Sequence, residues 1–157
     1  MISLLEELGV VVVEETKNRL SFTAKSIRHT APQKELCKQM RASFALAGPL
    51  LARHGSCTLP VPGGDRIGRR PVDTHISALQ QLGAVIDVFP DRYEMRAPHG
   101  LTGADIFLEE MSVMATENVV MAASLAKGTT IIRNAASEPH VQDVCNLLIA
   151  MRSEEHT

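Results

Sequence analysis

The sequence predicts a mixed α/β fold built from two similar units, and two observations indicate it. The motif LEELG at residues 5–9 recurs as LQQLG at residues 79–83, 74 positions later. Each copy is followed by the same succession of segments, so the unit is helix–strand–strand–helix–strand, repeated almost twice. A repeat of this length is a supersecondary building block and not a short solenoid repeat. An apolar content of 45% with only 3% aromatic residues predicts a core of aliphatic side chains and methionine.

The first half of each unit is a helix that ends at a glycine and continues into two strands. Residues 10–15 and 84–88 are mostly apolar and are expected to form the first strand of each unit. After a short polar turn, residues 19–24 and 92–97 alternate between polar and apolar side chains. Alternation with a period of two is typical of a half-buried strand, so one face of each is expected to pack against the core.

The second half of each unit is a helix followed by a strand. We expect the helices over residues 40–55 and 114–128, and the strands over residues 57–62 and 129–135. A surface helix would show a clear polar side, so the many small residues of both helices predict an interior position with close helix contacts. Pro49 is expected to kink the first of these helices. The small residues are Ala42, Ser43, Ala45, Ala47, Gly48, Ala115, Ala122, Ala123 and Ser124.

Composition and motifs argue against several classes of protein. The net charge of −2 argues against general binding to nucleic acids or membranes. No stretch approaches the roughly eighteen apolar residues of a membrane span, and no signal peptide is visible. Cys37, Cys57 and Cys145 are an odd number at wide spacing, which fits reduced thiols in the cytoplasm better than a disulfide framework. No Cys or His pair has metal-ligand spacing, and neither GxGxxG nor a P-loop motif occurs.

The most informative segment is the Pro/Gly-rich loop that precedes the second copy of the repeat. It carries one acid, Asp65, then Arg66, Arg69 and Arg70, and it runs into a helix that is expected to open with Pro71. Proline is favoured in a first helical turn, and the free N–H groups there face an incoming anion. One carboxyl group among guanidinium groups suits a site that protonates a substrate while it binds phosphate.

The motif GGDRIGRRPVDTHISAL at residues 63–79 closely resembles the active-site loop of the UDP-N-acetylglucosamine enolpyruvyl transferases. The resemblance implies an inside-out α/β barrel domain built of βαβαββ units, of which this chain would hold about two. It also implies transfer of the enolpyruvyl group from phosphoenolpyruvate to the 3′-hydroxyl of UDP-N-acetylglucosamine, the first committed step of peptidoglycan synthesis. The implied partners are these two small molecules and a second domain of the parent chain, and no cofactor is implied.

By this resemblance Asp65 is the proton donor, at a position where the family usually has a cysteine. The pKa of a free Asp is about 3.9, so this pKa must rise, or substrate must protonate the group, before it can donate near neutrality. The three nearby arginines would favour the carboxylate instead. An ordinary turn aspartate is the alternative. Because fosfomycin alkylates the family's cysteine, an aspartate there predicts fosfomycin resistance.

The resemblance also assigns residues that bind substrate. Arg70 matches an arginine that closes on the phosphate of phosphoenolpyruvate, and Arg41 matches another arginine of the substrate site. The segment that matches the contact to the uridine end comprises Arg70, Pro71, Val72, Asp73 and Thr74. Asp73 could instead be a pure helix cap, and Arg41 a solvated helix end.

A second sugar-nucleotide segment matches Glu110, Met111, Ser112 and Val113. Ser112 and the following backbone N–H groups could hold a diphosphate at a helix N-terminus. The family often has Lys where Glu110 stands and Gly where Met114 stands. His75 is interpreted as a helix-orienting residue, or as a neutral histidine of the core or a loop.

The sequence leaves two alternatives to this function. The first is an enolpyruvylshikimate phosphate synthase-like transferase, which shares the fold and the donor; the GGxxIGxRPVDxHIxxL pattern favours the sugar-nucleotide branch. The second is a non-catalytic relative or an isolated piece that binds ligand weakly or only folds.

Both ends of the chain are expected to be incomplete relative to the family. Residues 1–151 are interpreted as part of a transferase domain, with residues 138–151 as the first helix of a further unit. Residues 152–157, RSEEHT, are interpreted as read-through from a sequencing adapter, and a natural polar tail is the alternative. The chain alone is expected to be inactive and poorly stable or prone to associate.

Overall fold

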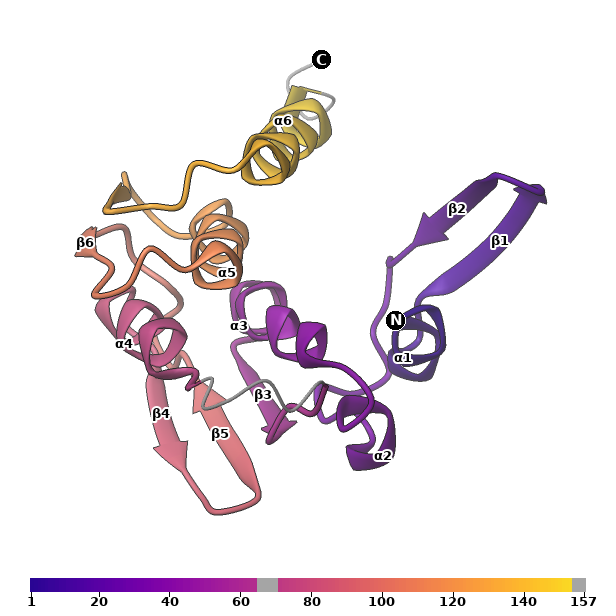
Figure 1. Cartoon of the computed structure of the whole chain (residues 1–157), viewed down its shortest axis with the longest axis horizontal. Coiled ribbons are helices and arrows are strands. Elements are labelled where there is room, and N and C mark those ends of the chain that lie inside the picture. Colours follow the sequence, from indigo (N-terminus) through magenta and orange to yellow (C-terminus); the bar gives the residue numbers. More distant parts are fainter. Residues whose placement is uncertain (65–70, 154–157) are drawn as a thin grey trace.

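The computed structural model of the 157-residue chain describes residues 1–64 and 71–153, and it has the predicted mixed α/β fold (Figure 1). The helices and strands follow the predicted order, with the short helix α2 and the short strand β6 as additions. The first unit contains α1 (Ile2–Leu8), β1 (Val11–Thr16), β2 (Arg19–Thr23), α2 (Lys34–Cys37), the 3₁₀ helix η1 (Arg41–Leu46), α3 (Ala47–His54) and β3 (Ser56–Pro60). The second contains α4 (Asp73–Gln81), β4 (Val85–Val88), β5 (Arg92–Arg96), β6 (Asp105–Phe107), α5 (Val113–Ala123) and β7 (Ile131–Arg133), and α6 (Pro139–Ser153) follows it.

The repeat is present in the backbone hydrogen bonds as well as in the sequence. Helices α1 and α4 are each followed by a glycine in the left-handed region, Gly9 at φ 104° and Gly83 at φ 96°, where a side chain would be strained. Farther along, Arg28 N–H donates to the Leu8 carbonyl at 2.8 Å, and Thr102 N–H donates to the Leu82 carbonyl at 2.9 Å. Donors and acceptors in these two bonds are both 74 positions apart, so the two units fold in the same local way.

The core lies where helices α3, α4 and α5 pack together, with the strands of the second unit on their outer side (Figure 1). The small residues that predicted interior helices are largely buried here: Ala47, Gly48, Ala115 and Ala122. A Cβ atom on Gly48 would lie 2.3 Å from the backbone oxygen of Asn118, so α3 and α5 cross in direct backbone contact. The prediction of interior helices is therefore confirmed for this pair.

The described strands form three small sheets. The largest has the order β3-β5-β4 and is antiparallel, so that Met95 of β5 lies opposite both Cys57 and Ile86, and all three side chains are buried. Strands β6 and β7 form a parallel pair, and β1 and β2 form a hairpin.

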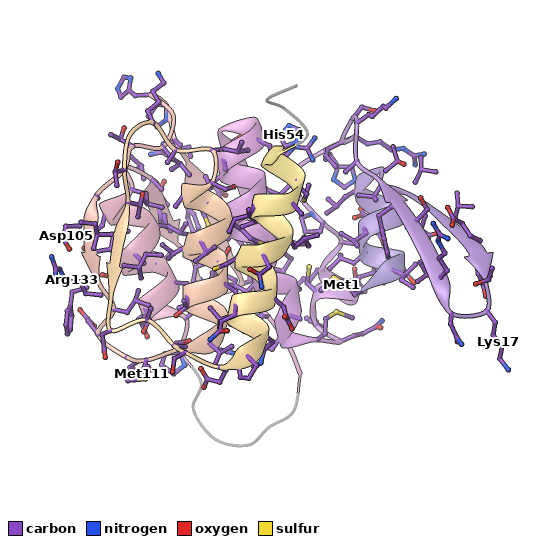
Figure 2. All side chains as sticks on the ribbon, turned by 90° about the horizontal axis from the view of Figure 1, so that it is seen from above. Met1, Lys17, His54, Asp105, Met111 and Arg133 are labelled. Atoms are coloured by element: carbon purple, nitrogen blue, oxygen red, sulfur yellow. The ribbon has the colours of Figure 1, made fainter. Side chains whose placement is uncertain are left out.

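The expectation that residues 19–24 form a half-buried strand is wrong, although a strand does form there. Leu20 and Phe22 are 43% and 51% exposed, and Val11 and Val13 of β1 are also exposed. Strand β5 pairs with β3 on one side and β4 on the other, whereas β2 pairs with β1 alone among the described strands. The hairpin extends away from the helices, and Figure 2 shows Lys17 at its far tip. The alternating side chains of β2 therefore have no core to pack against among the described residues.

Two predicted helix boundaries also differ from the structure. The helix expected over 40–55 changes from 3₁₀ to α at Ala47, so Pro49 lies in the first turn of α3, where it is tolerated, and does not kink a continuous helix. Helix α4 begins at Asp73 and not at Pro71, and the Pro71 carbonyl accepts a hydrogen bond from Arg41. The helix expected near the C-terminus is confirmed as α6. None of the described helices combines the length and the apolar character that crossing a bilayer requires.

Candidate functional site

A pocket of about 390 Å³ lies where the beginnings of three helices meet: η1, α4 and α5. Its lining brings together segments that are far apart in the sequence. Five of its residues belong to the predicted substrate site: Arg41, Pro71, Glu110, Ser112 and Val113. The other two, His75 and Met114, were not predicted to bind substrate.

Arg41 links the first two segments of the pocket. Its Nη2 donates to the Pro71 carbonyl at 2.8 Å, across thirty positions of sequence. Met40 before it has an extended backbone, so Arg41 is the first residue of η1 and its side chain turns back toward α4. Arg41 therefore lines the pocket and is hydrogen-bonded to its second segment.

Ser112 begins the third segment as the N-cap of α5. Its Oγ accepts from the Ala115 backbone N–H at 3.3 Å, and its carbonyl accepts from Thr116 Oγ1 at 2.8 Å. The other N–H groups of a first helical turn have no partner within their helix, so an anion in the pocket would meet donors there. Glu110 lines the same pocket, so a carboxylate stands where the family often has a lysine.

His75 forms a buried wall of the pocket, with 3% of its surface exposed. The edge of its ring meets Phe44, with ring centroids 5.2 Å apart at 87°. Burial, and secondly the charge of Arg41, lower its pKa from 6.5 to about 4, so the ring is neutral near pH 7. The interpretation of His75 as a histidine of the core is confirmed by its burial. Its place in the pocket was missed, because no sequence pattern shows which face of a helix lines a pocket.

The remaining predicted residues lie beside the pocket or outside the described part of the chain. Val72 and Thr74 are buried, and neither lines the pocket. Asp73 is exposed in the first turn of α4, where the helix dipole favours a negative charge. Met111 is 62% exposed, and Figure 2 shows it at the periphery. The remaining two, Asp65 and Arg70, lie outside the described residues.

The described residues offer no obvious metal site, since no three His, Cys, Asp or Glu side chains of residues 1–64 and 71–153 are grouped to hold an ion. The described lining of the pocket supplies one guanidinium, one imidazole, one carboxylate and the start of a helix.

Comparisons with known sequences agree with the motif. The model of the family described as EPSP synthase (3-phosphoshikimate 1-carboxyvinyltransferase) matches residues 1–154. UDP-N-acetylglucosamine 1-carboxyvinyltransferase of Bradyrhizobium diazoefficiens is 54% identical over 151 residues, which are 96% of this chain and 35% of the relative. The protein of the same name from Treponema denticola is 49% identical over 151 residues, with the same coverage. The chain thus spans about a third of the length of these curated relatives.

Solved structures agree with the fold. The enolpyruvyl transferase NikO from Streptomyces tendae superposes with a TM-score of 0.77 over 94% of this chain and 34% of its own, at 16% identity. EPSP synthase from Acinetobacter baumannii gives a TM-score of 0.65 over 90% of this chain and 33% of its own, also at 16% identity. These similarities show the fold alone, and they confirm the predicted fold class.

Proposed function

Because the chain belongs to the EPSP synthase (3-phosphoshikimate 1-carboxyvinyltransferase) family, we propose that it contributes the sugar-nucleotide site of a UDP-N-acetylglucosamine 1-carboxyvinyltransferase. Such an enzyme transfers the enolpyruvyl group of phosphoenolpyruvate to the 3′-hydroxyl of UDP-N-acetylglucosamine and releases phosphate, at the start of peptidoglycan synthesis. The observation that supports this most is the meeting of Arg41, Pro71 and Ser112 at one pocket.

The pocket's groups suit the diphosphate of a sugar nucleotide. The N-terminus of α5 offers backbone N–H groups and a favourable dipole to an anion. The Arg41 guanidinium adds a positive charge that is held in place by Pro71. Glu110 opposes this charge in part, so we expect weaker diphosphate binding than a lysine at that position would allow.

Chemistry at phosphoenolpyruvate is assigned to residues outside the described part. We propose that Asp65 gives its proton to the methylene carbon while the sugar hydroxyl adds to the neighbouring carbon and loses its own proton to a base of the second domain. A later elimination removes a proton from the new methyl group, breaks the C–O bond to phosphate and restores the double bond; Arg70 would stabilise the charge of the leaving phosphate. The full activity, both substrates and the second domain are attributed to the longer protein that the relatives' lengths suggest.

Calorimetric titration of the chain with UDP-N-acetylglucosamine tests the proposal. We expect Arg41→Met to weaken binding by roughly tenfold or more, since a charge-assisted hydrogen bond contributes about 1.5–3 kcal/mol. Arg53→Met is a matched control, because Arg53 Nη2 also donates to one backbone carbonyl, that of Ala24 at 2.6 Å, and it does not line the pocket.

Two results would contradict the proposal. One is equal loss of affinity in the Arg41 and Arg53 variants, which would mean that the nucleotide does not bind in this pocket. The other is tight binding of shikimate 3-phosphate with none of the sugar nucleotide, which would favour the synthase-like alternative.

A further inference from the structure

Asn118 is a fully buried amide that joins helix α5 to three other elements. Its Nδ2 donates to the Phe44 carbonyl of η1 at 3.0 Å, and its Oδ1 accepts from the Gly48 backbone N–H of α3 at 2.6 Å. Nδ2 also lies 3.1 Å from Nδ1 of His75, on α4. Asn118 therefore contacts each of the helical segments around the pocket wall that His75 forms.

The backbone partners determine which way the amide points. The Phe44 carbonyl can only accept a hydrogen bond, and the Gly48 N–H can only donate one. Turning the Asn118 amide over would place its oxygen against a carbonyl oxygen and its NH₂ group against an N–H. The Phe44 carbonyl and the Gly48 N–H therefore fix the NH₂ group of Asn118 on the side of His75.

This orientation determines the tautomer of His75. Both hydrogens of Asn118 Nδ2 are directed to acceptors, one to Phe44 and one to the imidazole, so His75 Nδ1 must accept. A neutral imidazole that accepts at Nδ1 carries its proton on Nε2. Within residues 1–64 and 71–153, Nε2 has no hydrogen-bond partner, and His75 lines the pocket.

We propose that Asn118 is a positioning residue that holds His75 in the neutral Nε2–H tautomer, so that this wall of the pocket presents a hydrogen-bond donor. The ligand group that fits such a wall is an acceptor oxygen, as in a phosphate, a carbonyl or a hydroxyl. A donor would meet an N–H there and be disfavoured. This role of Asn118 goes beyond the proposed function, and the tautomer can be measured without any ligand.

The test is ¹⁵N NMR of the imidazole nitrogens in the uniformly labelled chain at pH 7, with His75 assigned by the signals lost in His75→Gln. We expect Nε2 to show the shift of a protonated ring nitrogen and Nδ1 that of an unprotonated one. Asn118→Asp replaces the NH₂ donor with an acceptor oxygen, so we expect Nδ1 to become protonated in that variant and the pKa of the ring to rise.

Asn134→Asp is the matched control, because Asn134 Nδ2 also donates to a backbone carbonyl, that of Leu108 at 2.8 Å, away from His75. This variant should leave the His75 signals unchanged. A protonated Nδ1 in the unmodified chain would overturn the proposal. Because this measurement uses the unmodified chain, it tests the proposal even if Asn118→Asp does not fold. An unchanged His75 tautomer in a folded Asn118→Asp chain would overturn it as well.

Discussion

Gly48 and Asn118 meet across the crossing of α3 and α5, where the Gly48 N–H donates to Asn118 Oδ1 at 2.6 Å. A glycine inside a helix usually lowers helix stability, but here any Cβ would lie 2.3 Å from the Asn118 backbone oxygen. The same contact that requires glycine also helps to orient the amide beside His75. The packing of α3 against α5 and the orientation of the amide beside His75 thus both depend on the close contact between Gly48 and Asn118.

We expect Gly48→Ala to lower the free energy of unfolding by more than about 2 kcal/mol, because the added methyl forces the two helices apart. Urea denaturation followed by circular dichroism measures the loss. Gly100→Ala is the control: a Cβ there meets nothing within 4 Å, and only its positive φ of 76° adds strain, of about 1–2 kcal/mol. A Gly48 variant as stable as the unmodified chain would contradict the observed helix contact.

Stability should fall between pH 6.5 and about 4 because of His75. Its pKa in the folded chain is lowered to about 4, so the unfolded chain binds this proton first as the pH falls. The contribution of neutral His75 to the free energy of unfolding is complete above pH 6.5. It is lost as the pH falls toward 4, and the loss is on the order of 3 kcal/mol. Among the described residues, Arg41 and Glu110 are the charged groups that line the pocket with this ring.

Urea titrations at several pH values should show this loss, and His75→Gln should lack it. The pKa values of Asp91 and Asp105 are lowered from their ordinary 3.8, so these two groups change stability only at a lower pH than His75 does. A loss of the same size in His75→Gln would assign the effect to other groups.

The three thiols should differ in their reactivity toward Ellman's reagent. Burial raises the pKa of Cys57 to about 12 and also raises that of Cys37, so at pH 8 roughly one Cys57 thiol in ten thousand is a thiolate. Cys145 is only half-buried, in the groove between α5 and α6. One fast-reacting thiol is expected, and Cys145→Ser should remove it. Fast reaction of all three in the folded chain would contradict the burial of the other two.

The exposed hairpin should promote association of the chain. Leu20 and Phe22 lie on one face of β2, whose second edge is unpaired among the described strands. Phe22→Lys is expected to lower the light scattering of concentrated samples. Val88→Lys alters a more exposed residue, at 63% against 51% for Phe22, on β4 and should have a smaller effect. A chain that is monomeric at all concentrations would contradict the expectation.

An active enzyme that contains this chain should resist fosfomycin, because a carboxylate is a far weaker nucleophile than a thiolate. Asp65→Cys should introduce time-dependent inactivation. Asp65→Asn should lower turnover by roughly a hundredfold or more, since an amide cannot donate the proton. Normal turnover of Asp65→Asn would show that another group is the proton donor.

Much of the fold could be predicted because its signals are local. The glycine after α1 and α4, the hairpins and the order of elements follow from residues within a few positions of one another. The exposure of Leu20 and Phe22 could not be predicted. Alternation of polar and apolar residues indicates that a strand has two different faces, but it does not indicate which element packs on the apolar face.

The site divides in the same way. Resemblance to a known family assigned Arg41, Pro71 and Ser112 to one substrate site from three separate segments, and the structure places all three at one pocket. The contacts of His75 and Asn118 were missed: an asparagine in a mostly apolar helix was the available signal, and it does not identify its partners.

The sequence by itself determined the succession of helices and strands, the repeat and the family, since these depend on local backbone preferences and on a continuous motif. Only the tertiary structure decided that η1, α4 and α5 begin at one pocket, that Gly48 must be small, and that Asn118 lies against Nδ1 of His75. The physical reason is that hydrogen bonds such as those of Asn118 join residues 43 to 74 positions apart, and their partners exist only after the helices have packed.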